Sequence, residues 1–479
     1  MSSLRRKTIS GLGWLSLSQM GKQAIQLIIT AILARLLSPK DFGLISMIMV
    51  FANFVMIFSE MGISSALIQK QDTHDRHYYS VFWLNVIVGI ALTILFMAVS
   101  PLIAWFYNKP ELKVILVVIS INYFIASFVI IQQTILTKEM DFRSLAIRDI
   151  IAIVLSGGVS IYMAFHGFGV WSLVAQSLTF TLFNAIILWK LSSWRPKCQF
   201  NMADIKDIFS FSANLTGFNF INYFSRNIDQ LLIGKLLGAQ ALGYYSLAYK
   251  LMLYPLQNTS WIISKVMFPA FSKIQGNLEK VRVTYFKTVK AGALVAFPLM
   301  IGLFIMVPFL VTAIFGHKWM AAIGTIRILC VCGLFQSVGT TVGIIYLSMG
   351  RADLQYKLQY FGTALVVISV LCGLTWGING VALFYTLQSL LWVNVNIGIV
   401  SRLAGFRFKS FYSNLKIPLI IALGTITPLF LISQVFSFSP IPQIVVLVSC
   451  WIVFYLGMLF VTKEVAFKSR VPILSIITE

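Results

Sequence analysis

The stretch Ala34-Arg-Leu-Leu-Ser-Pro-Lys-Asp-Phe-Gly-Leu-Ile-Ser46 returns later in the chain as Gly234-Lys-Leu-Leu-Gly-Ala-Gln-Ala-Leu-Gly-Tyr-Tyr-Ser246. At this one offset, 234 − 34 = 200 residues, several pairs are identical: Leu36/Leu236, Leu37/Leu237, Gly43/Gly243, Ser46/Ser246, and on the same register Ser10/Ser210 and Ile28/Ile228. A second repeated pattern has Gly169-Val170 before Gln176-Ser177-Leu178 in one copy, and Gly380-Val381 before Gln388-Ser389-Leu390 in the other. The sequence therefore predicts one long unit present in two copies, followed by a shorter tail.

The composition places the chain in a membrane. Hydrophobic residues make up 58% of the 479 residues and charged residues only 11%, and a soluble domain could not cover so much apolar surface. Two similar halves in a membrane protein usually face each other across a central site, as in many transporters. The apolar run behind the short basic start is too long for the core of a cleavable signal peptide, so we expect the first span to remain.

Cysteine and histidine residues do not form a metal-binding pattern. Cys330-x-Cys332 has no second pair of ligands nearby, and His74-Asp-Arg-His77 falls in a short charged loop. Most of the cysteines lie inside apolar runs, where a thiol acts as a small hydrophobic group. We expect no metal and no cofactor.

We predict an all-α fold with about fourteen transmembrane helices, each of roughly 20 to 25 residues. The first copy holds the spans near 10–35, 42–66, 79–104, 112–136, 146–165 and 168–189. The second holds those near 208–235, 243–267, 288–312, 323–348, 358–376 and 378–400, and the tail those near 416–434 and 441–462. With an even number of spans per copy, about six, both copies enter the membrane in the same direction, related by a pseudo-twofold axis along its normal. The expected domains are 1–200, 201–405 and 406–479.

Loop charge predicts the orientation. With the N-terminus in the cytoplasm, nearly all basic loop residues fall on the inner side, and the outer side keeps only Lys40, Lys109, Lys113 and Lys318. We therefore expect a multi-pass protein of the cell inner membrane with both termini in the cytoplasm. The formal net charge of +22 then reflects topology and contact with anionic membrane lipids, and not nucleic acid. No loop is long enough for a soluble catalytic domain.

Charged residues inside the apolar spans are the candidates for function, because a charge at mid-bilayer needs a partner, a route to the headgroups or a wet cavity. Arg226 and Asp229 are three residues apart and share a helix face, so a structural ion pair is the competing interpretation. Lys22 lies on the equivalent helix of the first copy and Lys250 on the next helix of the second, and both add positive charge without an evident partner. Together these four residues predict a cationic cavity between the halves, suited to an anionic ligand such as a phosphate.

Other polar residues within the spans have two interpretations. Gln19, Gln23 and Gln26 either line the cavity or form hydrogen bonds between helices. Arg327 either extends the cavity or contacts a neighbouring helix, and we expect Asp149 to pair with Arg148 or Arg143. The further residues that could line the cavity are Gln19, Gln23, Gln26, Glu60, Asn222 and Arg327; for Glu60 structural pairing near the inner end of its span is the alternative.

Several motifs resemble a known family. They are Arg226-Asn-Ile-Asp229-Gln-Leu-Leu-Ile-Gly-Lys-Leu-Leu-Gly238, Leu242-Gly-Tyr-Tyr-Ser-Leu-Ala-Tyr-Lys250, Gly11-Leu-Gly-Trp14, Leu33-Ala-Arg-Leu-Leu-Ser-Pro-Lys-Asp-Phe-Gly-Leu44 and Phe58-Ser-Glu-Met-Gly-Ile-Ser-Ser-Ala-Leu-Ile-Gln69. They resemble the Wzx-type polysaccharide and O-antigen flippases of the multidrug/oligosaccharidyl-lipid/polysaccharide (MOP) superfamily. The similarity is closest to the colanic-acid and teichuronic-acid exporter branch and spans the whole chain.

The resemblance implies a fourteen-helix fold that moves an undecaprenyl-pyrophosphate-linked oligosaccharide from the inner to the outer leaflet, for exopolysaccharide, O-antigen or related polymers. It implies that Lys22, Arg226 and Lys250 take the pyrophosphate while Asp229 holds Arg226. Coupling to protons or sodium is usual in the superfamily, but no residue here is identified as the ion site. A polysaccharide polymerase and export machinery are the implied partners.

Three other functions compete with this interpretation. A cation-coupled drug exporter of the same superfamily favours acidic cavity residues, whereas this interior is net basic. A membrane glycosyltransferase or polymerase needs a sizeable external loop with catalytic residues, which this chain lacks. A lipid II flippase is compatible with the composition, although the motif around Asp229 favours the polysaccharide branch.

Overall fold

The computed structural model describes residues 2–60, 67, 75–202, 205, 222–223, 226–435 and 440–462. Within these ranges the side chains of 2–17, 59–60, 258–262, 264–266, 352, 432–435 and 440–441 are not described. The regular elements in the described part are all helices, without a β-strand. The chain divides into two compact units, Met1–Gly243 and Tyr244–Glu479.

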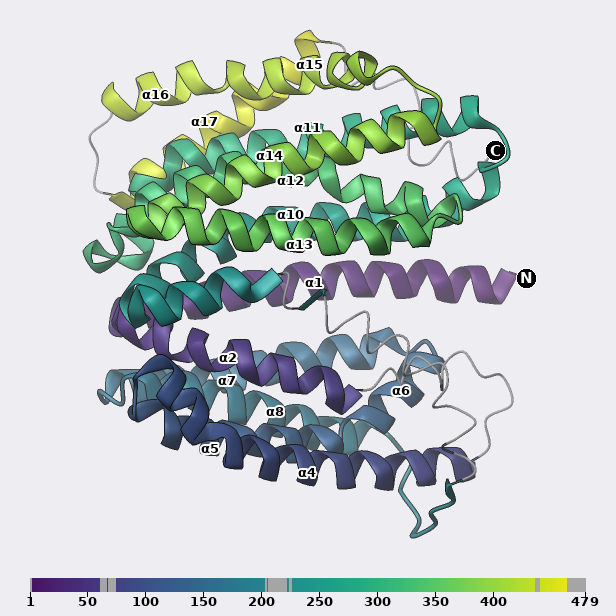
Figure 1. Cartoon of the computed structure of the whole chain (residues 1–479), viewed down its shortest axis with the longest axis vertical. Coiled ribbons are helices and arrows are strands. Elements are labelled where there is room, and N and C mark those ends of the chain that lie inside the picture. Colours follow the sequence, from purple (N-terminus) through teal and green to yellow (C-terminus); the bar gives the residue numbers. More distant parts are fainter. Residues whose placement is uncertain are drawn as a thin grey trace. The chain divides into compact units, whose positions relative to one another are not determined.

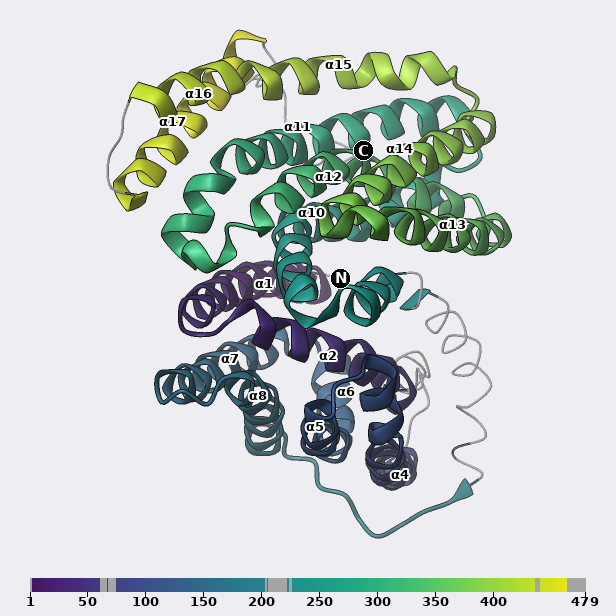
Figure 2. The ribbon, with the colours of Figure 1, turned by 60° about the vertical axis from the view of Figure 1, so that its left-hand side comes forward.

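The first unit is a bundle of long helices (Figures 1 and 2). It contains α1 (Ser2–Leu36), α2 (Pro39–Glu60), α4 (Asp75–Tyr107), α5 (Glu111–Ser127), α6 (Ile130–Lys138), α7 (Phe142–Phe165) and α8 (Val170–Leu191), followed by a helical segment at 226–236. α4 packs on α5, α7 packs on α8, and α1 packs on α7. Tyr123, Phe82 and Phe96 are fully buried in this unit.

The second unit is also helical. It contains most of α10 (Gly238–Ile274), then α11 (Leu278–Leu310), α12 (Ala322–Ser348), α13 (Ala352–Gly373), α14 (Gly377–Leu403), α15 (Phe408–Gly424), α16 (Ile426–Val435) and α17 (Pro440–Val461). α12 packs between α11 and α14, while α15 and α17 contact α11. Trp319, Tyr285 and Tyr346 are among its largest fully buried side chains.

The duplicated stretch begins α2 with a reciprocal cap. The backbone N–H of Ser38 donates to Asp41 Oδ2 at 2.9 Å, and the backbone N–H of Asp41 donates to Ser38 Oγ at 3.3 Å. This capping box satisfies two N–H groups that the first helical turn leaves without intrahelical partners. Pro39 occupies the first helical position, where its missing N–H costs nothing.

The chain is a multi-pass membrane protein. In the described part, nine helical stretches are long and apolar enough to cross a membrane, or ten if the bent pair α5–α6 forms one span. One of the nine, 353–403, contains both α13 and α14. These two helices meet closely at Gly373 and Gly380, because a Cβ on Gly380 would lie 2.3 Å from the Gly373 carbonyl oxygen. Much of the expected span at 208–235, and residues 61–66 of the second, lie outside the described residues.

Two expected spans differ from a single straight helix. Residues 112–136 form two helices, α5 and α6, bent by 42°. At the bend the Phe128 carbonyl accepts a hydrogen bond from Trp189 Nε1 of α8 at 3.0 Å. This side-chain donor satisfies a carbonyl at the end of α5, and so stabilises a break that an apolar pattern does not reveal. Residues 416–434 are similarly divided between α15 and α16.

Candidate functional site

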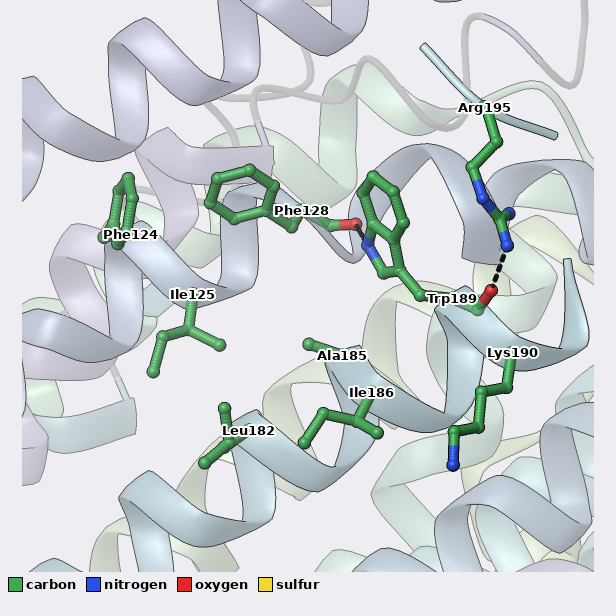
Figure 3. A pocket seen from close by; sticks show the side chains of 9 residues that line it. All are labelled: Phe124, Ile125, Phe128, Leu182, Ala185, Ile186, Trp189, Lys190 and Arg195. Carbon is green, nitrogen blue, oxygen red and sulfur yellow. Dashed lines mark hydrogen bonds between the residues drawn. The ribbon is translucent and has the colours of Figure 1, made fainter.

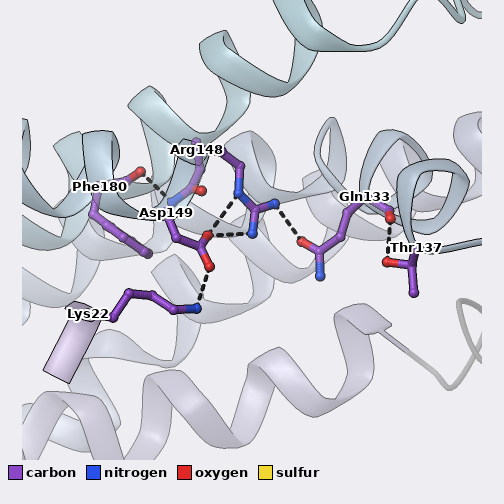
Figure 4. A network of polar contacts seen from close by, with 7 residues as sticks. Lys22, Gln133, Thr137, Arg148, Asp149 and Phe180 are labelled. Atoms are coloured by element: carbon purple, nitrogen blue, oxygen red, sulfur yellow. Dashed lines mark hydrogen bonds and ion pairs between the residues drawn. The ribbon is translucent and has the colours of Figure 1, made fainter. Parts of the chain in front are cut away.

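A buried charge network joins three helices of the first unit (Figure 4). Lys22 of α1 forms an ion pair with Asp149 of α7. Arg148 Nε donates to Asp149 Oδ1 at 2.8 Å, and Arg148 Nη1 donates to Gln133 Oε1 of α6 at 3.0 Å. The Asp149 carboxylate is therefore shared by two cations.

Because this network is largely buried, a charge in it that lost its partner would lower the stability of the protein. The side chains of Lys22, Asp149 and Arg148 are 28%, 14% and 9% exposed. With two cations and one carboxylate, the group carries one net positive charge. The pairing of Asp149 with Arg148 was expected, but Lys22 was expected without a partner, and that expectation is wrong. The partners are 127 residues apart, so helix packing and not local sequence brings them together.

Arg226 and Asp229 do not form the ion pair that the resemblance implied. The salt bridges between described residues do not include this pair: Asp229 is 2% exposed and accepts a hydrogen bond from the Gln230 backbone N–H at 2.8 Å. Arg226 is exposed. The segment is anchored just before it, where Tyr223 Oη donates to the Val50 carbonyl of α2 at 2.6 Å. Arg226 is therefore exposed while Asp229, one turn further along, is buried.

Lys250 lies on α10 in the second unit, and the residue has exposed surface although protein atoms surround its amine closely. Beside it in the chain, the Tyr249 ring contacts the Tyr385 ring of α14 edge to face, with centroids 6.3 Å apart. Gln336 Nε2 of α12 donates to Tyr385 Oη at 3.2 Å. These contacts join α10, α12 and α14 at the turn of α10 that carries Lys250.

Of the other predicted cavity-lining residues, Arg327 contacts a neighbouring helix, and the rest are half-buried or lie at a helix end. Arg327 Nε points to the Phe304 carbonyl of α11 at 3.4 Å, and its guanidinium lies 5.5 Å from the Phe304 ring centre, which favours the helix-contact interpretation. Gln19, Gln23 and Gln26 are half-buried on α1, and Asn222 is half-buried. Glu60 ends α2, and its side chain lies outside the described residues.

The sequence did not single out Gln133, and it indicated Arg148 only as one possible partner of Asp149. Arg148 lies inside α7 and is buried. The position of Arg148 next to Asp149, within a helical run, was the one signal that could have indicated a buried network.

Comparison with known proteins agrees with this architecture. The sequence model of a family described as "Polysaccharide biosynthesis protein" matches residues 32–324. The chain belongs to this family. Two curated relatives are the teichuronic acid biosynthesis protein TuaB of Bacillus subtilis, 31% identical over 415 residues (85% of this chain and 83% of TuaB), and the lipopolysaccharide biosynthesis protein WzxC of Escherichia coli, 28% identical over 432 residues (88% and 87%). The resemblance to the Wzx-type group of the MOP superfamily is confirmed.

Solved structures show the fold of this polysaccharide biosynthesis family member. The lipid II flippase MurJ, in an inward closed conformation, superposes with a TM-score of 0.75 at 15% identity, covering 95% of this chain and 99% of MurJ. An inward-facing multidrug MATE transporter of the MOP superfamily gives 0.63 at 16% identity, covering 83% and 99%. The names of these two solved proteins state lipid flipping and multidrug transport, and neither names an enzyme.

Proposed function

We propose that this protein moves a polyprenyl-pyrophosphate-linked oligosaccharide from the inner to the outer leaflet of the cytoplasmic membrane, for synthesis of a cell-surface polysaccharide. Its fourteen helices would form two lobes of six and a tail of two, with both termini in the cytoplasm. The lobes would alternate between inward-facing and outward-facing states. The pyrophosphate would enter a cationic cavity while the polyprenyl chain stays in lipid.

One observation carries this proposal: the charged groups within the described helices are net positive and include cations outside the ion pairs of the described residues. The Lys22–Asp149–Arg148 network keeps one net positive charge. Arg226 and Lys250 are exposed, and the ion pairs between described residues include neither of them. Basic side chains at membrane depth favour an anionic ligand, because a phosphate supplies the missing counter-charge and several strong acceptors.

The repeat supports a shared role for these positions. At the offset of 200 residues, Lys22 corresponds to Asn222, and Gln26 corresponds to Arg226. The equivalent helices of the two copies thus carry polar groups at equivalent positions, each copy with one cation. Transport needs no bond to break: a ligand shifts the protein between two states only by binding them unequally.

A second candidate is a lipid II flippase, favoured by the structural likeness to MurJ over 95% of this chain. Lipid II is also a lipid-linked diphosphate, so the same cations would serve. The names of the sequence relatives favour a polysaccharide precursor instead. A drug exporter of the same superfamily fits less well, because a net-basic interior repels cationic drugs.

The decisive experiment detects the labelled lipid-linked repeat unit in each leaflet, in cells with and without this protein. We expect the unit to accumulate in the inner leaflet when the protein is absent. Normal appearance in the outer leaflet would disprove the proposal, and selective trapping of lipid II would support the second candidate.

The cationic cavity is tested in the same assay. Arg226→Ala and Lys250→Ala should each abolish flipping while membrane insertion persists, whereas Lys113→Ala, at an exposed position in the first turn of α5, should be neutral. Arg226→Lys should keep part of the activity. Normal flipping by both alanine variants would show that these cations do not bind the diphosphate.

Coupling to protons or sodium stays a prediction, as does cooperation with a polysaccharide polymerase and export machinery. Flipping in vesicles with an imposed proton or sodium gradient would identify the ion.

A further inference from the structure

A groove of about 510 Å³ lies on the first unit between α5 and α8 (Figure 3). Its walls are apolar, formed by Phe124, Ile125 and Phe128 on one side and by Leu182 and Ile186 on the other. Phe124, Leu182 and Ile186 are 39%, 43% and 42% exposed, so the groove opens outward. Its volume falls within the range of small-molecule sites.

One end of the groove is basic. Lys190 and Arg195 line it where α8 ends, beside Trp189. Arg195 Nη1 donates to the Ser192 carbonyl at 2.6 Å and Nη2 donates to the Trp189 carbonyl at 2.7 Å, which places a positive charge at a helix C-terminus. Nη1 also donates to the Trp194 carbonyl at 2.8 Å, and the guanidinium still has N–H donors that these bonds do not use. Lys190 is exposed, and the hydrogen bonds and ion pairs between described residues do not include its amine.

The groove is held in shape by its own contacts. Trp189 Nε1 donates to the Phe128 carbonyl at the α5–α6 bend, at 3.0 Å. The Phe124 and Phe128 rings meet edge to face with centroids 5.1 Å apart, and the Arg195 guanidinium lies 5.4 Å from the Trp189 ring centre. A preformed site loses little conformational entropy when a ligand enters.

We propose that this groove binds one anionic phospholipid, with its phosphate at Lys190 and Arg195 and an acyl chain along Phe124, Leu182 and Ile186. Under the proposed topology this lipid belongs to the inner leaflet. The site lies on the first unit's own helices, and its lining residues do not include Lys22 or Arg226. The lipid stabilises the bent α5–α6 pair against α8.

Three features favour this occupant. From Leu182 to Lys190 the helix rises about 12 Å, close to the roughly 15 Å depth of one hydrocarbon leaflet, so an acyl chain matches the apolar wall. Tryptophan is typical of the headgroup level, and Trp189 lies between the apolar wall and the cations. Basic pockets between transmembrane helices bind acidic headgroups, and a zwitterionic lipid would leave the charge of Lys190 uncompensated.

The test uses the full-length protein, purified and delipidated in detergent, with added phosphatidylglycerol, phosphatidylcholine or inorganic phosphate. Native mass spectrometry counts bound lipid, and thermal unfolding measures stabilisation. We expect phosphatidylglycerol alone to give a retained adduct and a higher melting temperature. Lys190→Gln should weaken its binding about fivefold, the effect of one lysine near an anionic surface, whereas Lys113→Gln should have no effect.

A second variant tests whether lipid binding needs the apolar groove as well as the positive charge. Leu182→Trp fills the groove from an exposed position, so it should fold normally but lose the adduct. Equal retention of phosphatidylcholine, a full effect from inorganic phosphate, or unchanged phosphatidylglycerol binding in both Lys190→Gln and Leu182→Trp would each overturn the proposal. None of these measurements involves flipping. A negative result would therefore reject the lipid site without bearing on the proposed flippase function.

Discussion

Gly43 and Gly243 occupy the same position in the two copies of the repeat, and each packs against the backbone of the other copy. A Cβ on Gly43 would lie 1.6 Å from the Ala239 carbonyl oxygen, and a Cβ on Gly243 would lie 1.9 Å from the Pro39 carbonyl oxygen. At the offset of 200 residues, Pro39 and Ala239 also correspond. The contact is therefore reciprocal, as expected where two equivalent surfaces meet about a local twofold axis.

We predict that Gly43→Ala or Gly243→Ala destabilises the protein by about 3 kcal/mol, the upper end for an overpacked contact. The atoms that the new methyl group would meet belong to the backbone, which cannot rotate away as a side chain can. Apparent melting temperatures in detergent would measure the loss. Gly158→Ala is the matched control, because a Cβ there has no atom within 4 Å. Equal melting temperatures for Gly43→Ala and Gly158→Ala would show that this contact is not tight in the membrane.

The sequence predicted the close backbone contact at Gly43 and Gly243 only indirectly. The repeated motif was visible because both copies keep the same glycine, and the apolar runs indicated where helices occur. Local pattern could not show the bend between α5 and α6, because the hydrogen bond from Trp189 to the Phe128 carbonyl joins residues 61 positions apart. It also could not show that Asp149 neutralises Lys22 across 127 positions. Arg226 and Asp229 looked paired because spacing implies a shared face, but a shared face does not fix side-chain direction.

Asp149→Asn should cost about 2–3 kcal/mol of stability, slightly below the value for breaking a fully buried ion pair. The substitution leaves Lys22 and Arg148 together without their shared carboxylate. Asp353→Asn is the control, because the Arg351–Asp353 pair at 3.2 Å is 44% and 52% exposed and such exposed pairs contribute little to stability. A loss no larger in Asp149→Asn than in Asp353→Asn would mean that the network is solvated.

Lys22→Met should cost less stability than Asp149→Asn, because Arg148 then neutralises Asp149 alone. If Lys22 also binds the diphosphate, flipping should fall sharply although the melting temperature changes little. This separation of stability from flipping distinguishes a binding role from a structural one. Normal flipping by Lys22→Met would assign Lys22 to the structural network only.

Arg327→Gln should leave flipping nearly intact, in contrast to Arg226→Gln. Arg327 already contacts the Phe304 carbonyl and ring, and losing a partly exposed cation–π contact costs about 0.5–1 kcal/mol. Flipping rates normalised to membrane protein level would compare the two variants. A complete loss in Arg327→Gln at normal protein level would extend the cationic cavity to α12.

Trp189→Phe tests whether the indole N–H maintains the bend between α5 and α6. The variant keeps an aromatic ring but removes the donor to the Phe128 carbonyl, so we expect a loss of about 1–3 kcal/mol, the cost of a buried acceptor left without a partner. Hydrogen exchange should accelerate in Ile130–Lys138, whose start depends on that bend. Trp105→Phe is the matched control, since Trp105 is 76% exposed and should change neither exchange nor stability. If exchange in α6 is the same in both variants, the bend is set by the α5 and α6 backbones themselves, and α8 only covers it.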